Sequence, residues 1–96
     1  MGEARNNARI VTAVVPSLRI DVLGARAFRV SRSYFAKGVA SGNVLIGEAA
    51  AGKAAQVQPG ERVQALGLGE FELLSVDGST RKGNLRVSLR VQTEPG

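Results

Sequence analysis

The chain has 96 residues, a net charge of +5, and neither cysteine nor histidine. The missing residue types exclude disulfides, Cys/His zinc sites, thiolate nucleophiles and every catalytic pair that needs a histidine. A chain of this length forms one domain with a modest core, and no apolar stretch approaches the roughly 20 residues that cross a bilayer. Most cations are arginines, whose planar guanidinium matches phosphate oxygens. The charge therefore favours a nucleic-acid partner over a membrane surface or an acidic protein.

The first third of the chain predicts a strand and a short helix. Residues 9–15 are rich in β-branched side chains and are typical of a strand, which Pro16 ends. Ser17 is the expected N-cap of the first helix, because its hydroxyl can accept a hydrogen bond from a free N–H of the first turn. The apolar residues of this helix recur at helical spacing at Ile20, Leu23 and Ala27.

A second short helix is expected between residues 31 and 42. Ser31 or Ser33 caps its start, and Gly42 suits the left-handed conformation that stops a helix. Gly38 lies inside it and costs about 1 kcal/mol relative to alanine, which close packing against the first helix would explain. The residues expected to face the core are Phe35 and Val39.

Beyond the helices, the hydrophobic pattern is that of short strands. A connection of small residues is expected at 47–55 and a polar loop at 77–84. The last strand alternates apolar and polar residues, so one of its faces is buried and the other carries Arg86 and Arg90, which we interpret as edge-strand charges. The class is therefore α+β, with two short helices packed on a small, mostly antiparallel sheet. The expected strands after the helices are 44–46, 63–66, 71–76 and 85–91.

The candidate functional residues are basic and hydroxyl side chains near the expected helix starts. A helix N-terminus attracts phosphate through its free N–H groups, and the sequence Ser31-Arg32-Ser33 adds a guanidinium and two hydroxyls there. Residues 19–37 contain five cations and a single acidic residue, Asp21. This density of positive charge favours a binding surface over an ordinary solvated face. The candidate RNA-binding residues are Arg19, Arg26, Arg29, Ser31, Arg32, Ser33, Lys37, Arg81 and Lys82.

Nothing in the sequence supports catalysis or a metal site. The carboxylates are scattered, Gly67-Leu68-Gly69 lacks the rest of a dinucleotide fingerprint, and Gly52-Lys53 is not followed by the Ser or Thr of a P-loop. Three phenylalanines and one tyrosine leave no stacking platform for reading a single strand base by base. We expect a non-enzymatic chain without cofactor or small-molecule substrate, which contacts the phosphates and the shape of RNA.

Four short motifs, in order, resemble the ribosomal S4-type RNA-binding domain. The family pattern reads R-L-D, then S-R, then G-x-V-x-V-N-G, then V-x-x-G-D; the chain lacks the asparagine before its second glycine. The resemblance implies binding to structured RNA through helix residues that correspond here to Arg19, Arg32 and Lys37. The matching motifs are Arg19-Ile20-Asp21, Ser31-Arg32-Ser33, Gly42-x-Val44-x-Ile46 and Val57-x-Pro59-Gly60-Glu61.

The C-terminal third, through Gly67 to Phe71 and Gly78 to Val87, is similar to that of the YlmH-like proteins, bacterial and plastid proteins with a C-terminal S4 domain. This similarity implies that the chain is the C-terminal piece of a longer protein. It also implies that the RNA is ribosomal RNA or tRNA on the large ribosomal subunit, with a role in the rescue of stalled ribosomes. We expect a cytoplasmic monomer that does not bind membranes.

Two other interpretations stay open. S4 domains also accompany pseudouridine synthases, so the chain can be the targeting domain of an RNA-modifying enzyme whose catalytic aspartate lies elsewhere. It can also be a protein-interaction module that docks through its sheet. The expected organisation is a flexible segment at 1–8, a first strand plus S4-type core at 9–66, a β-hairpin extension at 67–92 and a flexible tail at 93–96.

Overall fold

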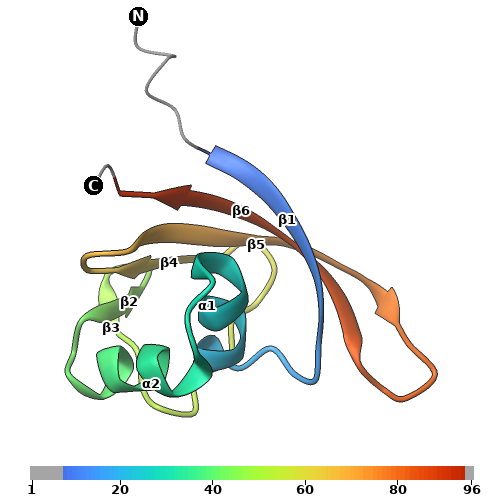
Figure 1. Ribbon diagram of the computed structural model, residues 1–96, viewed down its shortest axis with the longest axis horizontal. Helices are drawn as coiled ribbons and strands as arrows, with labels where there is room; N and C mark the ends of the chain where they lie inside the picture. The colour runs from blue at the N-terminus through green and yellow to red at the C-terminus, as the bar shows by residue number, and fades with distance from the viewer. Residues whose placement is uncertain (1–7, 95–96) are drawn as a thin grey trace, which may run out of the picture.

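The computed structural model describes residues 8–94, which form two helices and a six-stranded antiparallel sheet (Figure 1). The α+β class and the order of one strand, two helices and five further strands are confirmed. The helices are α1 (Ile20–Phe28) and α2 (Arg32–Ala40); the strands are β1 (Ala8–Val15), β2 (Val44–Ile46), β3 (Ala49–Ala50), β4 (Arg62–Ala65), β5 (Gly69–Ser79) and β6 (Leu85–Thr93).

The ends of the described chain belong to the sheet. Ala8 and Thr93, which the sequence analysis places in flexible ends, lie in β1 and β6. The Glu94 N–H donates to the Leu68 carbonyl at 3.0 Å. The remaining positions of the two predicted flexible segments, 1–7 and 95–96, lie outside the described residues. Neither described helix is long and apolar enough to span a bilayer.

The first and last strands are neighbours. The strand order is β1-β6-β5-β4-β2-β3, and β1 pairs with β6 from Ala8 opposite Gln92 to Val15 opposite Leu85. β6 therefore lies inside the sheet, and our interpretation of Arg86 and Arg90 as edge-strand charges is wrong. The alternation along β6 correctly predicts one buried face, but a local pattern does not reveal which strands lie on either side.

The predicted C-terminal hairpin forms from β5 and β6, and it is longer than expected. β5 continues to Ser79 through the predicted polar loop, with irregular register between Leu73 and Ser75 and between Val76 and Gly78. Figure 1 shows the end of this hairpin projecting beyond the helices. The base of the hairpin lies in the middle of the sheet, because β5 also pairs with β4 and β6 with β1.

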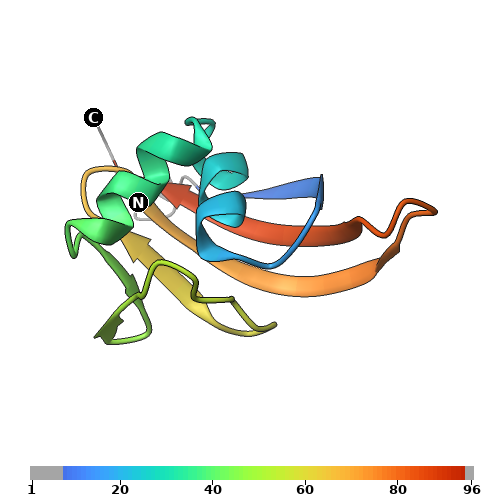
Figure 2. The same ribbon diagram turned by 90° about the horizontal axis from the view of Figure 1, so that it is seen from below.

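Both helices pack on one face of the sheet (Figure 2). Gly24 of α1 lets the helices approach each other, because a Cβ there would overlap the ring of Phe35 on α2. Gly38 does not have this role, since its Cβ would meet only Val44 Cγ2, at 3.7 Å. The predicted core residues of both helices are buried: Ile20, Leu23, Ala27, Phe35 and Val39.

The start of α1 differs from the prediction. Its N-cap is Arg19 and has no side-chain capping bond, whereas the Ser17 hydroxyl accepts a hydrogen bond from the Arg19 N–H at 3.3 Å. The segment before the helix is held extended against residues 55–57. The Ile20 N–H donates to the Ala55 carbonyl at 2.9 Å, and the backbone of Arg19 forms an isolated antiparallel β-bridge with Gln56. The helix can therefore begin only after this pairing ends.

Both ends of α2 follow from the sequence. The Ser31 hydroxyl accepts a hydrogen bond from the Tyr34 N–H at 3.0 Å and caps the start. At the other end, the Asn43 N–H donates to the Gly38 carbonyl at 2.9 Å, and the Gly42 N–H donates to the Val39 carbonyl at 3.1 Å. With a φ of +80° at Gly42, this is a Schellman motif.

One element was not predicted. The small-residue segment after β2 contains the two-residue strand β3, and Ile46 pairs with Ala49 across a turn at Gly47 and Glu48. Gly47 has a φ of +61°, which glycine adopts without steric cost. Residues 44–50 therefore form a short β-hairpin, and the rest of the segment returns toward α1.

Candidate nucleic-acid interface

Asp21 joins the starts of the two helices. It lies in the first turn of α1, and its side chain is 7% exposed. The Nε of Arg19 donates to Asp21 Oδ1 at 3.2 Å, and the Nε of Arg32 donates to Asp21 Oδ2 at 3.0 Å. One carboxylate therefore holds a guanidinium from each helix start.

The two arginines keep Asp21 ionised. Burial alone would raise the pKa of Asp21, but the hydrogen bonds and charges of Arg32 and Arg19 outweigh it and hold the pKa below its ordinary value. Only the Nε of each guanidinium is used in these bonds. Within residues 8–94 the Nη atoms of Arg19 and Arg32 have no hydrogen-bond partner, and their side chains are 39% and 54% exposed.

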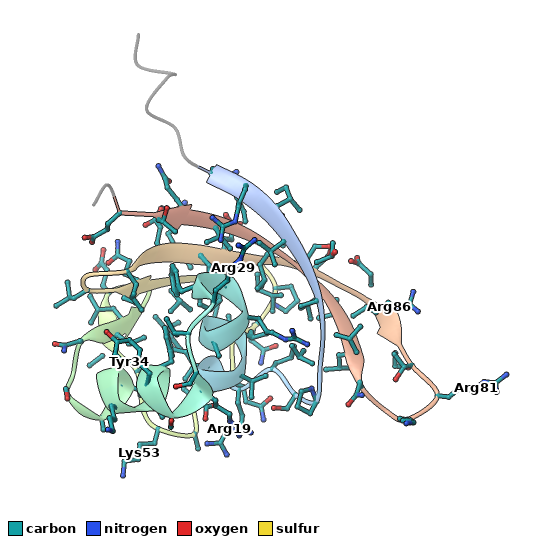
Figure 3. The ribbon with its side chains drawn as sticks, viewed as in Figure 1. Arg19, Arg29, Tyr34, Lys53, Arg81 and Arg86 are labelled. Atoms are coloured by element: carbon teal, nitrogen blue, oxygen red, sulfur yellow. The ribbon has the colours of Figure 1, made fainter. Side chains whose placement is uncertain are left out.

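Beside this ion-pair network lies an open basic depression of about 350 Å³. Arg19, Ser33 and Lys37 line it together with Lys53 and the buried Asp21. Figure 3 shows Arg19 and Lys53 along the same edge of the molecule. We use the name basic depression for the surface formed by Arg19, Arg32, Ser33, Lys37 and Lys53, which carries four positive charges against the one of Asp21.

The start of α2 adds to the positive potential. No acidic residue lies in its first turn, so the partial positive charge of the helix N-terminus is not offset on that helix. Ser31 and Ser33 approach each other with their hydroxyl oxygens 3.4 Å apart. Lys37 lies one turn after Ser33 and extends the cationic surface along α2.

Lys53 is the functional candidate that the sequence did not reveal. It lies in the small-residue segment between β3 and Gln56, where no periodicity marks a binding residue. Backbone pairing brings this segment to the start of α1, since the Ala55 carbonyl accepts from Ile20 and the Val57 N–H donates to the Leu18 carbonyl at 2.9 Å. The only available signal was that Lys53 is the single cation of this segment.

The other predicted cations lie elsewhere. Arg26 donates through Nη2 to the Val14 carbonyl at 3.0 Å and lines a separate depression with Arg86. Figure 3 shows Arg29 at the opposite end of α1 from Arg19, and Arg81 at the tip of the β5–β6 hairpin. Thus the structure gathers Arg19, Arg32, Ser33 and Lys37 around Asp21, with Ser31 as the adjacent cap. The basic depression is not lined by Arg26, Arg29, Arg81 or Lys82.

Arg29 ends α1 in a conformation that favours glycine. Its φ is +58°, and within residues 8–94 it is the only residue other than glycine with a positive φ. The Val30 N–H donates to the Ala25 carbonyl at 3.2 Å across it. Arg9 of β1 also reaches this helix end and donates through Nη2 to the Ala27 carbonyl at 3.3 Å. Both arginines therefore complement the negative end of the helix dipole.

The other carboxylates of the described chain do not line the basic depression. Within residues 8–94 no three of them are grouped so that they could hold a metal ion. Asp77 accepts hydrogen bonds from the hydroxyls of Ser75 and Ser88, both at 2.7 Å, and these bonds lower its pKa. It is thus a bonded surface carboxylate of the sheet.

No family model matches the chain, and no curated protein matches its sequence. The four motifs and the geometry of the basic depression therefore carry the functional proposal.

Proposed function

We propose that the chain is a non-catalytic RNA-binding module of the S4 type, which holds structured RNA by its phosphates at the basic depression. The observation that supports this most is the placement of two guanidinium groups, from two different helix starts, on the single carboxylate of Asp21. Because only Nε bonds to Asp21, each partly exposed guanidinium keeps free Nη donors that can bond phosphate oxygens.

The shape and polarity of the basic depression favour a phosphate backbone over a small molecule. It is open rather than enclosed, and its polar groups are guanidinium, ammonium and hydroxyl groups beside the single carboxylate of Asp21. The rest of its wall consists of small apolar side chains of α2: Ala36, Val39 and Ala40. Such groups position a nucleic acid by its backbone. A structured RNA presents neighbouring phosphates at a spacing set by its fold, so an array of cations fixed by Asp21 selects for RNA shape.

Contacts between the S4-like motifs support the family assignment. The first motif, around Asp21, is joined to the second by the Arg32 ion pair. The last motif reaches the same helix start, because the Val57 N–H donates to the Leu18 carbonyl. The third motif forms β2 after the Gly42 turn. The first, second and fourth motifs, which are separate in the sequence, thus meet at the start of α1.

By the same resemblance, the RNA is ribosomal RNA or tRNA on the large ribosomal subunit, and the protein works in the cytoplasm as part of a longer chain. A targeting domain of an RNA-modifying enzyme would use the same surface. The two differ in the chemistry of the adjoining domain, and both require RNA binding at the basic depression.

The test is binding of the full chain to ribosomal RNA and to tRNA at about 50 and 200 mM salt. Four to six phosphate contacts predict a slope of log affinity against log salt of roughly −3 to −5. The variant Lys37→Ala/Lys53→Ala removes two cations that make no ion pair within residues 8–94. It should make the slope shallower by about 1.4 to 1.8 and leave the melting temperature unchanged.

The matched control is Arg62→Ala/Arg90→Ala, which removes the same charge from exposed positions of β4 and β6 on the face away from the helices. Equal losses in the two double variants would indicate that net charge, and not the basic depression, governs binding. A flat salt response of the unmodified chain would refute the proposal.

A further inference from the structure

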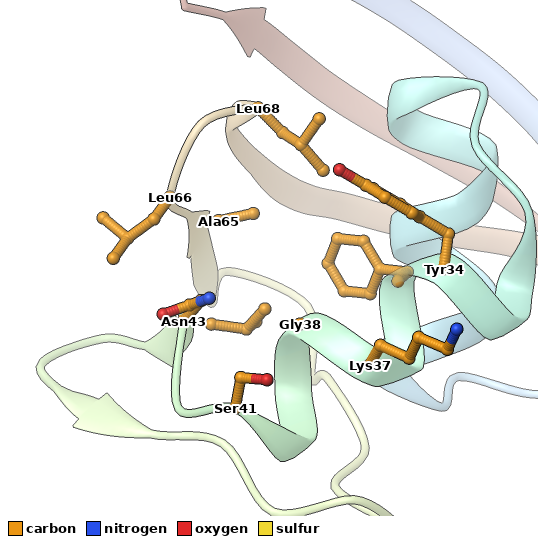
Figure 4. A pocket seen from close by; sticks show the side chains of 10 residues that line it. Tyr34, Lys37, Gly38, Ser41, Asn43, Ala65, Leu66 and Leu68 are labelled. Atoms are coloured by element: carbon orange, nitrogen blue, oxygen red, sulfur yellow. The ribbon is translucent and has the colours of Figure 1, made fainter.

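A second depression lies on the other side of α2 from the ion-pair network, and Figure 4 shows it from close by. It has a volume of about 240 Å³ and lies between α2 and the turn that joins β4 to β5. We call it the Tyr34 groove; its walls include Tyr34, Gly38, Ser41, Asn43, Leu66 and Leu68.

We propose that the Tyr34 groove binds one unpaired base of the RNA whose phosphates lie at the basic depression. The inference rests on the proposed function and deepens it, because it specifies an RNA with an unstacked nucleotide beside its structured part. Sequence-specific recognition of RNA commonly uses such nucleotides, since their bases can stack on aromatic side chains and bond through their edges.

Tyr34 supplies an aromatic surface. It is the only tyrosine of the chain, and it is 57% exposed. Figure 4 shows its side chain extending from α2 toward Leu68, so that the ring forms a wall of the groove. Stacking of a base on an exposed aromatic ring is a main source of affinity for unpaired nucleotides. We expected no stacking platform from the composition; one ring in a groove can hold one base.

Polar groups at the opposite end of the groove suit the edge of a base. The side chains of Ser41 and Asn43 make no hydrogen bond to any other residue within 8–94. The amide of Asn43 offers both an acceptor and donors. Its backbone is fixed, because its N–H donates to Gly38 and its carbonyl accepts from the Leu66 N–H at 3.0 Å. The backbone that carries this amide is therefore bonded to α2, the helix that carries the ring.

Gly38 keeps the groove open. It costs α2 stability relative to alanine, yet no close packing requires it. A Cβ at this position would make an ordinary contact, 3.7 Å, with Val44 Cγ2, and both residues line the groove. A glycine that packing does not demand is explained if a ligand must approach the helix backbone at that point.

Lys37 connects the two sites. It lines both the basic depression and the Tyr34 groove, and Figure 4 shows its side chain running along α2 beside Tyr34. A nucleotide with its phosphate at Lys37 therefore has its base beside the groove. The volume is below the roughly 300–1,000 Å³ of pockets for drug-sized ligands, which favours a single base over a larger group.

The experiment compares two RNA stem-loops that differ by one bulged adenosine, with the full chain at one salt concentration. The unmodified chain should bind the bulged RNA more tightly than the paired one. Tyr34→Ala should weaken binding of the bulged RNA by about 5- to 150-fold and leave the paired RNA unchanged, whereas Tyr34→Phe keeps the ring and should retain the preference. Gly38→Ala should raise the melting temperature and still lower affinity for the bulged RNA.

The outcomes separate this inference from the proposed function. If Tyr34→Ala binds both RNAs as the unmodified chain does, with the same salt slope, the groove does not hold a base and the basic depression remains the RNA site. Equal weakening of both RNAs would also refute the inference, because it would assign Tyr34 to backbone contacts. If the unmodified chain binds neither RNA, both proposals fail.

Discussion

Asp21 accepts a hydrogen bond from Arg32 at 3.0 Å and thereby ties the first turn of α1 to the first turn of α2. Arg19 bonds to the other carboxylate oxygen. The carboxylate therefore sets the positions of two cations that are separated by twelve residues in the sequence. Asp21 is therefore a positioning residue of the basic depression. Removing it, or one of its partners, should change both stability and RNA binding.

Arg32→Ala should lower the free energy of unfolding by about 1–2 kcal/mol. Loss of a partner from a fully buried ion pair costs about 3–5 kcal/mol, but Arg32 is half exposed and Asp21 keeps Arg19, so solvent and the second guanidinium reduce the loss. The measurement is urea denaturation of both proteins.

The double variant Asp21→Asn/Arg32→Ala provides the control, because it removes the charge that would be left with one partner. It should be less destabilised than the sum of the two single variants. Strict additivity would show that Asp21 and Arg32 do not interact energetically.

Stability should fall in acid partly through Asp21. Its pKa in the folded chain is lowered, so its contribution is fully present above the unfolded value of about 3.9 and is lost as the pH falls through the folded pKa. Asp77 has a lowered pKa for a different reason, hydrogen bonds from Ser75 and Ser88, and acts in the same direction.

Urea denaturation between about pH 2 and pH 6 tests this. The dependence of unfolding free energy on pH should be shallower below about pH 4 in Asp21→Asn than in the unmodified chain. Asp77→Asn serves as the comparison at an exposed site. A curve for Asp21→Asn that parallels the unmodified one would contradict the assignment.

The two helical glycines should respond oppositely to the same substitution. Gly24→Ala would drive a Cβ into the Phe35 ring and should destabilise the fold by about 1–3 kcal/mol through overpacking. Gly38→Ala meets only an ordinary contact and should stabilise α2 by up to about 1 kcal/mol. Thermal or urea denaturation of the two variants compares them directly, and a loss of stability in Gly38→Ala would contradict the packing described.

Arg29 should be replaceable by glycine with a gain in stability. The left-handed backbone at Arg29 costs about 1–2 kcal/mol for a residue with a Cβ, while its charge at the helix end returns about 0.3–1 kcal/mol. Arg29→Gly relieves the backbone, so it should be about 1 kcal/mol more stable than Arg29→Ala, which keeps the strain and loses the charge. Denaturation curves of both variants provide the measurement.

The same two variants test whether Arg29 contacts RNA. It lies at the end of α1 opposite Arg19 (Figure 3), so RNA affinity should stay within about twofold of the unmodified chain in both variants. A large loss of affinity in a stabilised Arg29→Gly chain would extend the RNA surface along α1.

The sequence by itself determined the elements whose signals are local. The spacing of Ile20, Leu23 and Ala27 predicted the buried face of α1, and Gly42 correctly marked the end of α2. The sequence left the N-cap of α2 open between Ser31 and Ser33, and Ser31 caps the helix. These signals are short-range, because helical periodicity, a capping hydroxyl and a left-handed glycine each act within a few residues. The α+β class followed from the order of such elements.

Only the tertiary structure decided which residues share a surface. Because β1 pairs with β6, Arg86 and Arg90 lie on an inner strand of the sheet. Pairing of residues 18–20 with 55–57 delays the start of α1 and brings Lys53 to the basic depression. The same fold dispersed Arg26, Arg29 and Arg81. Such contacts join segments far apart in the chain, and their free energy depends on the partner strand or helix, which no local pattern of residues specifies.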